Sequence, residues 1–322
     1  MKERKNIPAL IAILVVPAIL VILLQWRGGS EDGDETLGQS FEFDIKNYSM
    51  IDPALYVFME LAPVKLDDNE WHGIAVGPDD DIFVCGKGRV AVFDNSGKKM
   101  KTFAVKSSPR CIGVGESGIV YLGADDHVEV YDAEGVQTAV WESAGEKAFI
   151  ASLAVSPDTV FAANAADGSV LQFDKSGKLL KTIDGFVLFS SPNLDIALGP
   201  SGDLWAANPG RREMRRYSSA GRLVDSWRNA GRTIEGFSGC CNPMHIAVRS
   251  DGTIITSEKN IVRIKILDSD GGVVGAVAGP EDLSGNGESL DLCVDSKNRI
   301  LVLDTAMKAV RVFAEKNGDE HE

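Results

Sequence analysis

The sequence lacks the short local motifs by which many enzymes are recognised. It contains no G-x-S-x-G nucleophile elbow, no glycine-rich phosphate loop and no H-E-x-x-H zinc motif. Only four histidines occur in 322 residues, and they are scattered at His72, His127, His245 and His321. The sequence therefore shows no convincing nucleophile arrangement and no local histidine-rich metal signature.

Basic residues are few compared with acidic ones. The chain has 33 Lys and Arg against 47 Asp and Glu, so its formal net charge is −14. An acidic surface repels phosphate backbones, which excludes nucleic acid as an expected partner. The hydrophobic content of 44% is that of a globular protein with a buried core.

One long apolar run stands near the start of the chain. Residues 7–26, IPALIAILVVPAILVILLQW, contain no charged side chain. In a helix they would span about 30 Å, which matches the hydrocarbon core of a bilayer. Three bases in residues 1–6 favour the cytoplasmic side, and no small-residue cleavage site follows the run. We expect an uncleaved transmembrane signal anchor, with a cleaved signal peptide as the alternative.

This anchor would place the rest of the chain outside the cytoplasm, in an extracytoplasmic or periplasmic space. Residues 27–40, RGGSEDGDETLGQS, are rich in glycine, serine and acid and are expected to form a flexible tether. Residues 316–322 are expected to be a disordered tail. The folded domain is therefore predicted to run from 41 to 315.

Six similar segments organise that domain. Aligned by eye, their inner apolar runs centre on positions 74, 112, 153, 196, 246 and 292, at intervals of 38, 41, 43, 50 and 46 residues. Each of the first five units has four short apolar runs separated by turns rich in Gly, Asp and Ser, and no sustained helical periodicity occurs after the anchor. Such periods predict an all-β, six-bladed propeller.

The sixth unit ends after its third strand. The strand-like run ALYVFMEL, residues 54–61, precedes the first unit and has no other place in the repeat. We expect it to complete the last blade, because this joins the two ends of the ring and covers an open sheet edge.

The repeat is clearest in RVAVFD, residues 89–94, and the segment 239–271, GCCNPMHIAVRSDGTIITSEKNIVRIKILDSDG, carries a second pattern. The first resembles the NHL repeats of six-bladed propellers, and the second is similar to a block in bacterial, membrane-anchored NHL-repeat proteins. The resemblance covers roughly residues 70–315. It implies the fold and leaves the activity open, since relatives include enzymes, receptor ectodomains and interaction modules.

The links between blades are longer than the turns within them, so the face where inner strands begin is the expected functional face. We call it the upper face. The residues that open the inner strands form one column on it: Gly73, Cys111, Ser152, Asp195, His245 and Asp291. This column should lie nearest the central channel, where unlike polar groups converge. It predicts a ligand-binding rim that includes Cys111, Asp195, His245 and Asp291.

A second column ends the second strand of each blade. In blades four to six it holds Asn208, Glu258 and Asp304, with Lys259 directly after Glu258. These residues are candidates for the same rim, while the alternative is that they brace the following loop through its backbone. One histidine with several carboxylates also suits a divalent metal, for which Asp195, His245 and Asp291 are the candidate ligands.

Two adjacent cysteines, Cys240 and Cys241, lie in the longest upper link. They could bond to each other as a strained ring, reach Cys111 across the channel, or remain thiols that ligate a metal or meet a redox partner. The alternative is a purely structural role, in which the turn before Pro243 positions His245.

Three functions remain open on these residues. The first is a membrane-anchored, extracytoplasmic binding or scaffold module that takes a protein or small-molecule ligand on its upper face. The second is a metal-dependent hydrolase or lyase of the propeller kind, and the third is an accessory to an extracytoplasmic redox system that uses Cys240 and Cys241. The absence of catalytic motifs favours the first.

Overall fold

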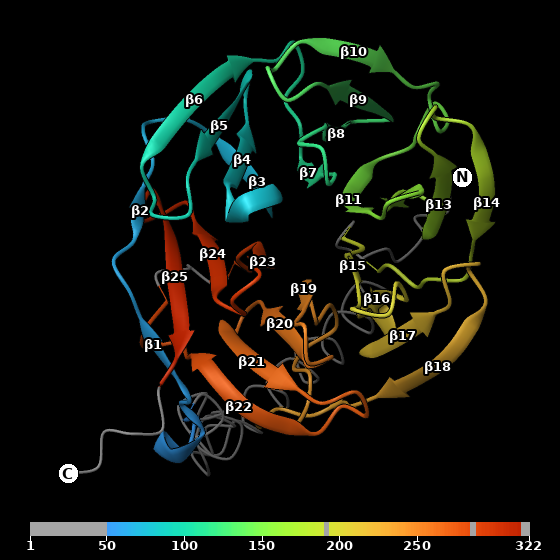
Figure 1. Cartoon of the computed structure of the whole chain (residues 1–322). Helices are drawn as coiled ribbons and strands as arrows, with labels where there is room; N and C mark the ends of the chain where they lie inside the picture. Colours follow the sequence, from blue (N-terminus) through green and yellow to red (C-terminus); the bar gives the residue numbers. More distant parts are fainter. Residues whose placement is uncertain (1–49, 190–192, 284–287, 317–322) are drawn as a thin grey trace, which may run out of the picture. The chain divides into compact units, whose positions relative to one another are not determined.

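A computed structural model describes residues 50–189, 193–283 and 288–316, all of which belong to one compact unit, Lys46–Glu322. Six antiparallel sheets are arranged like blades around a central axis (Figure 1). The prediction of an all-β, six-bladed propeller is confirmed. Three short 3-10 helices complete the described part: η1 (Pro53–Leu55), η2 (Pro78–Asp80) and η3 (Pro209–Arg211).

Each of the first three blades is a four-stranded sheet whose strands follow one another in sequence from the axis outward. Blade 1 consists of β3 (Trp71–Val76), β4 (Ile82–Gly86), β5 (Arg89–Phe93) and β6 (Lys99–Ala104). Blade 2 consists of β7 (Cys111–Val114), β8 (Val120–Ala124), β9 (His127–Tyr131) and β10 (Gln137–Val140). Blade 3 consists of β11 (Ile150–Val155), β12 (Thr159–Asn164), β13 (Ser169–Asp174) and β14 (Leu179–Ile183).

Blades 4 and 5 repeat this order, and blade 6 combines both ends of the domain. Blade 4 consists of β15 (Ile196–Leu198), β16 (Leu204–Asn208), β17 (Glu213–Tyr217) and β18 (Leu223–Arg228). Blade 5 consists of β19 (His245–Val248), β20 (Ile254–Glu258), β21 (Arg263–Leu267) and β22 (Val273–Ala278). Blade 6 consists of β23 (Leu292–Val294), β24 (Ile300–Asp304), β25 (Ala309–Glu315) and, from the N-terminal side, β1 (Phe58–Glu60) and β2 (Val64–Lys65).

Strand β1 closes the ring as the sequence predicted, although it is shorter than the expected run 54–61. It pairs antiparallel with β25, and Phe58 lies opposite Glu315. Arg311 of β25 donates two hydrogen bonds to Glu60, at 2.8 and 2.6 Å. The expected strand began at residue 54, but residues 54 and 55 belong to η1, which Pro53 begins. Proline fits the first turn of a helix and has no N–H group for a sheet ladder.

The hydrophobic core is divided into six clusters, each between two neighbouring blades. One cluster, for example, joins Ile264 of blade 5 to Ile300 of blade 6, and another joins Val84 of blade 1 to Leu301 of blade 6. The second strand of a blade lies inside the sheet and is covered on both faces, so all five residues of β4, β8, β16, β20 and β24 are buried. The continuous apolar runs in the sequence reflect this position.

The turns between third and fourth strands require glycine for two reasons. Gly177 and Gly271 have φ of +88° and +90°, which strains any residue with a Cβ. A Cβ on either glycine would also lie within 2.6 Å of the ring of a tryptophan on the preceding blade, Trp141 or Trp227. The recurring glycine of the repeat therefore lets each blade pack against its neighbour.

The inner strands begin where predicted only in blades 2 and 5; in blades 4 and 6 they begin at Ile196 and Leu292, one residue after the predicted Asp195 and Asp291. In blades 1 and 3 they begin at Trp71 and Ile150, each two residues before the predicted start, and a β-bulge follows in both. The bulge absorbs one extra residue, so the strands regain the common register at Gly73 and Ser152.

Several predicted segments lie outside the described residues: the cytoplasmic tail (1–6), the anchor (7–26), the tether (27–40), the start of the predicted domain (41–49) and residues 317–322 of the tail. Among the residues that are described, no helix is long and apolar enough to cross a membrane.

We expect Phe58→Ala to lower the free energy of unfolding by about 3–5 kcal/mol, because the ring is 4% exposed and packs in the cluster between blades 5 and 6. Met59 lies on the same strand and is 49% exposed, so Met59→Ala should cost less than about 1 kcal/mol. Urea denaturation of the full chain measures both. Equal effects of the two substitutions would contradict a stabilising role for β1.

Candidate functional site

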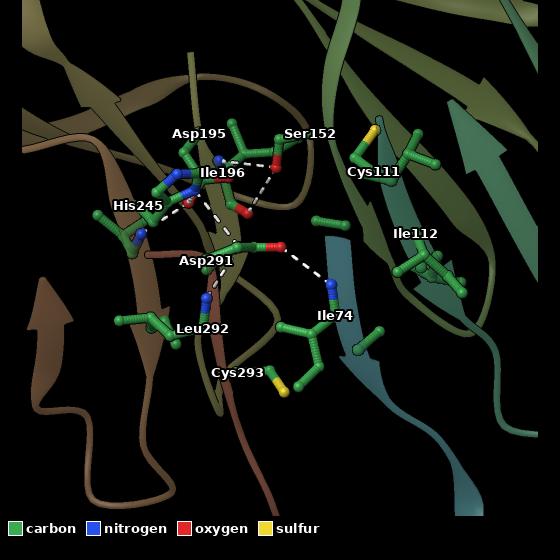
Figure 2. Close-up of a pocket in the computed structure, with 18 of the residues that line it drawn as sticks. Ile74, Cys111, Ile112, Ser152, Asp195, Ile196, His245, Asp291, Leu292 and Cys293 are labelled. Atoms are coloured by element: carbon green, nitrogen blue, oxygen red, sulfur yellow. Dashed lines mark hydrogen bonds and ion pairs between the residues drawn. The ribbon is translucent and has the colours of Figure 1, made fainter. Parts of the chain in front are cut away.

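The inner strands have one edge that faces the channel, and side chains of the first column satisfy its N–H groups. Ile196 N donates to Ser152 Oγ at 3.3 Å, Ile246 N to Asp195 Oδ2 at 2.6 Å, and Ile74 N to Asp291 Oδ2 at 3.0 Å (Figure 2). In each pair, the column residue of one blade accepts from the inner strand of the next blade. An N–H group without a partner inside a protein is costly, so these contacts tie adjacent blades together at the axis.

His245 stands between the two carboxylates of this column. Its Nδ1 lies 3.3 Å from Asp291 Oδ1 and 3.9 Å from Asp195 Oδ2 (Figure 2). Burial disfavours the charged imidazole, but the contacts with Asp291 and Asp195 outweigh it, so the pKa of His245 is raised. The structure therefore brings together Asp195, His245 and Asp291, as the sequence predicted.

The electrostatics of Asp195 are set by its burial. Loss of hydration raises the pKa of this carboxyl group to about 6, against the opposing attraction of His245. Asp291 adds repulsion in the same direction as burial. The pKa of Asp195 thus lies closer to neutral pH than that of an ordinary aspartate, and shifts of this kind are typical of functional sites.

The opposite half of the channel mouth has different chemistry. Gly73 and Cys111 occupy the column in blades 1 and 2 and have no side-chain oxygen. They therefore cannot accept from Ile112 N and Leu153 N in the way that Ser152 and Asp195 accept from the same strand position of the next blade. Cys111 Sγ instead donates to Ile150 O at 3.6 Å. Burial raises the pKa of Cys111 well above that of an ordinary thiol. Cys111 therefore stays protonated and is not a nucleophile at neutral pH.

A cavity of about 240 Å³ lies along the axis between these two halves. Residues of all six inner strands line it, including Cys111, Asp195, His245 and Asp291. A second hollow of about 430 Å³ shares His245 and Asp291 and opens at the starts of the inner strands. The predicted upper face thus carries a continuous polar depression.

Several residues of this depression were missed in the sequence. They directly precede the first column or lie in the upper links: His72, Arg110, Asn193, Met244 and Glu288. His72 Nδ1 is 2.8 Å from Pro109 O, and its Nε2 is 3.6 Å from Glu70 Oε1. Three of them could have been predicted from the repeat, because His72, Arg110 and Met244 each stand one residue before a column residue.

The second column does not reach the rim. Asn208, Glu258 and Asp304 are completely buried and brace the loops that cover them. Asn208 Oδ1 accepts from Val187 N at 2.7 Å, and Asp304 Oδ1 accepts from Met307 N at 3.0 Å. Each side chain replaces a missing backbone partner in a loop, which corresponds to the structural alternative considered for this column.

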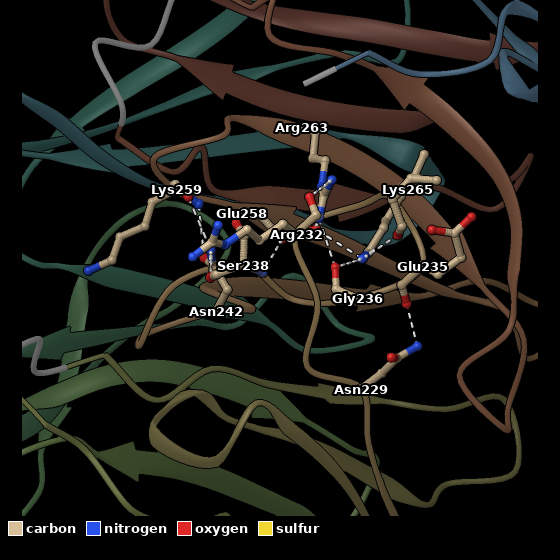
Figure 3. A network of polar contacts seen from close by, with 11 residues as sticks. Asn229, Arg232, Glu235, Gly236, Ser238, Asn242, Glu258, Lys259, Arg263 and Lys265 are labelled. Carbon is tan, nitrogen blue, oxygen red and sulfur yellow. Dashed lines mark hydrogen bonds and ion pairs between the residues drawn. The ribbon is translucent and has the colours of Figure 1, made fainter. Parts of the chain in front are cut away.

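Glu258 also neutralises two buried cations. Its Oε1 lies 2.9 Å from Arg263 Nε and 3.0 Å from Lys265 Nζ (Figure 3). Burial lowers the pKa of Lys265 to about 8. Both cations donate to Gly236 O, at 2.7 Å each, so they hold the covering loop in place. Removal of one partner from such a cluster costs more than the cluster itself contributes to stability.

The adjacent cysteines lie beside this cluster. None of the five cysteines, all of which fall in the described ranges, forms a disulfide, and Cys240 Sγ is 3.2 Å from Cys241 Sγ. Neither Cys240 nor Cys241 lines the axial cavity or the upper hollow. Lys259 is half-buried, and its N–H and C=O bond the side chain of Asn242. Lys259 is therefore not part of the rim, and like the cysteines it lies outside the axial cavity and the upper hollow.

The donor atoms of the column do not fit a divalent metal. Oxygens of Asp195 and Asp291 already accept backbone N–H groups, and His245 Nδ1 faces both carboxylates. Among the described residues, no group of three or more His, Cys, Asp or Glu side chains is arranged to hold a metal ion. The three candidate ligands therefore form a hydrogen-bonded ion cluster.

The protonation of this cluster predicts a pH effect on stability. The folded state raises the pKa of Asp195 from 3.8 to about 6 and also raises that of His245, so it binds more protons than the unfolded chain. The contribution of Asp195 is fully present below the unfolded pKa of 3.8 and is lost as the pH rises through about 6. That of His245 is lost at higher pH, as the pH passes the raised pKa of the imidazole.

We expect the stability advantage of the wild-type chain over Asp195→Asn to shrink between about pH 4 and pH 7 by on the order of 1–3 kcal/mol, because ionisation of the buried carboxyl group is unfavourable. Thermal unfolding at several pH values measures it. An advantage that grows with pH would contradict the assignment, and Glu134→Gln, which removes an exposed carboxylate, serves as the control.

Comparisons with known proteins place the chain by its fold alone. No family model matches the sequence, and no curated protein matches it either. The NHL resemblance is therefore not shown at the level of the family.

Solved structures with the same fold include a streptogramin B lyase, with a TM-score of 0.60 and 11% identity over 80% of this chain and 98% of that one. They also include a selenomethionine form of virginiamycin B lyase from Staphylococcus aureus, with a TM-score of 0.54 and 12% identity over 77% and 81% of the two chains. A catalytically inactive histidine-to-alanine variant of that lyase with quinupristin gives a TM-score of 0.57 and 10% identity over 80% and 100%. The chain is thus similar to these lyases as a six-bladed propeller.

Proposed function

We propose that the protein is a binding module held at the outer face of a membrane by residues 7–26, and that its channel mouth receives a small polar ligand. The observation that carries this proposal is the convergence of Asp195, His245 and Asp291 in a solvent-connected cavity. A concave site with a few convergent polar groups and shifted pKa values is typical of ligand sites.

The two halves of the mouth indicate the chemistry of the ligand. Asp195 and Asp291 place carboxylates on one side of the cavity. On the other side, Gly73 and Cys111 have no side-chain oxygen for the backbone N–H groups of Ile112 and Leu153, and we infer that these groups are left for a ligand. A ligand that donates hydrogen bonds at one end and accepts them at the other matches this polarity. Free amino acids and small primary amides have this character.

The upper hollow can accommodate a larger body attached to such a group. Trp71 and Phe149 give it apolar surface, and Arg110 and Glu288 give it charge of both signs. The end of a peptide or a protein loop therefore fits the same site, so the proposal covers both a small-molecule and a protein ligand.

We expect at least one compound in a panel of the free amino acids, acetamide and glycinamide to raise the melting temperature of the full chain by about 2 °C or more at millimolar concentration. Asp195→Asn and Asp291→Asn should abolish the shift, because asparagine keeps an oxygen for the neighbouring N–H and loses the charge. Differential scanning fluorimetry, followed by calorimetry of any positive compound, is the measurement.

Glu134→Gln controls for a general effect of charge, because this carboxylate is exposed. A panel without any positive compound would contradict the small polar ligand proposed for the channel mouth. A shift that survives both column substitutions would show that the compound binds elsewhere.

A second candidate function is acid–base catalysis of a lyase reaction. The raised pKa of His245 and the value of about 6 for the pKa of Asp195 pair an acid with a base in one cavity. The similar lyases, one of which is inactive without a particular histidine, favour this candidate. In this candidate function, His245 and Asp195 would donate protons to the substrate and accept protons from it.

Quinupristin is the direct probe for this second candidate. If it holds, the full chain converts quinupristin to a product seen by liquid chromatography and mass spectrometry, and His245→Gln lowers the rate by about 100-fold or more. Absence of conversion, or a rate unaffected by His245→Gln, would exclude this lyase activity and leave the binding proposal standing.

A further inference from the structure

The loop that carries the adjacent cysteines holds two thiols of unequal access. Cys240 is exposed and Cys241 is buried, and their sulfurs are 3.2 Å apart. Adjacent cysteines in an extended chain point to opposite sides, so this proximity is a property of the loop. A bulky reactant can approach Cys240 and is kept from Cys241 by the protein around it.

The loop is clamped on both sides of the pair. Asn242 Nδ2 donates to Ser238 O at 2.8 Å and to Lys259 O at 3.0 Å, and Lys259 N donates to Asn242 Oδ1 at 2.9 Å. Ser238 N donates to Glu258 Oε2 at 3.3 Å (Figure 3). Since Glu258 is itself fixed by Arg263, the segment 239–241 is a short arch between two anchored ends.

The remaining cysteines lack this arrangement. Cys85 and Cys111 are buried and Cys293 is half-buried, and loss of hydration raises the pKa of all three thiols. High thiol pKa values and poor access both slow thiol–disulfide exchange. Reactivity toward disulfides should therefore be confined to the arch.

We propose that Cys240 and Cys241 form a reversible dithiol–disulfide site that exchanges electrons with low-molecular-weight disulfides, of which oxidised glutathione is the probe. The site is separate from the channel mouth and does not depend on the function proposed there. In this site, the exposed Cys240 is the thiol that reacts first, and the buried Cys241 next to it is the resolving thiol.

The exchange proceeds in two displacements. The Cys240 thiolate attacks one sulfur of the oxidant R–S–S–R, forms a Cys240–S–S–R mixed disulfide and releases one RS⁻. Cys241 then loses its proton, and its thiolate attacks Cys240 Sγ, forms the Cys240–Cys241 bond and releases the second RS⁻. Two protein thiols are oxidised and one oxidant disulfide is reduced to two thiols. The product is an eight-membered ring, whose strain makes it readily reducible.

The test uses the full chain and oxidised glutathione as the probe. After exposure, the protein is denatured, alkylated with N-ethylmaleimide and digested with trypsin, which yields residues 233–249 as a peptide with both cysteines and no other. We expect this peptide to lack alkyl groups and to have lost the mass of two hydrogen atoms, and dithiothreitol should restore two alkylation sites. Peptides that contain Cys85, Cys111 and Cys293 should remain alkylated and serve as internal controls.

Two matched variants separate the roles of the thiols. Cys241→Ser should retain glutathione on Cys240, because the resolving thiol is missing. Cys240→Ser should react at least about tenfold more slowly, because the remaining thiol is buried. Circular dichroism and melting curves establish that both variants are folded.

Three outcomes would overturn the proposal. One is wild-type protein that keeps glutathione on Cys240 while Cys241 is alkylated. Another is wild-type protein in which both cysteines are still alkylated after prolonged exposure. The third is equal reactivity of the two variants.

Discussion

Each inner strand of the propeller has an edge that no neighbouring strand covers, and the N–H groups along this edge must find acceptors at the axis. Ser152, Asp195 and Asp291 supply those acceptors across the blade boundaries. The same side chains create the polar cavity, because acceptors placed at the axis have to converge there. Stability and the candidate site therefore arise from one requirement, the satisfaction of backbone donors in a closed ring.

Charge is distributed unevenly around that ring. Asp195, His245 and Asp291 come from blades 4 to 6, whereas Gly73 and Cys111 come from blades 1 and 2. His245 lies between two carboxylates that would repel each other without it, which explains why its pKa is raised in spite of burial. The charged groups of the mouth therefore lie on one side of the axis, and this asymmetry is the basis for the proposed polar ligand.

The cysteine pair depends on a different buried cluster. Arg263 and Lys265 need Glu258 as a counter-ion, and all three hold the loop that leads to Ser238. This loop fixes one end of the arch, and Asn242 fixes the other. The buried ion cluster thus stabilises blade 5 and, through the backbone, keeps the two sulfurs in contact. The structure separates this site from the channel mouth, although both lie close to His245 in the sequence.

The repeat period, the order of strands and the closing strand follow from the sequence by itself, because the alternation of short apolar runs and glycine turns is a local property of the chain. Local alternation also places the starts of the inner strands to within two residues, which is enough to predict that Asp195, His245 and Asp291 lie together. The buried position of Asn208, Glu258 and Asp304, the contribution of His72 and Arg110 to the upper hollow, and the distance between the two sulfurs were decided only by the tertiary structure. These features depend on how the long upper links fold over the strand ends, and such links obey no repeat, so their contacts arise from packing between segments far apart in the chain.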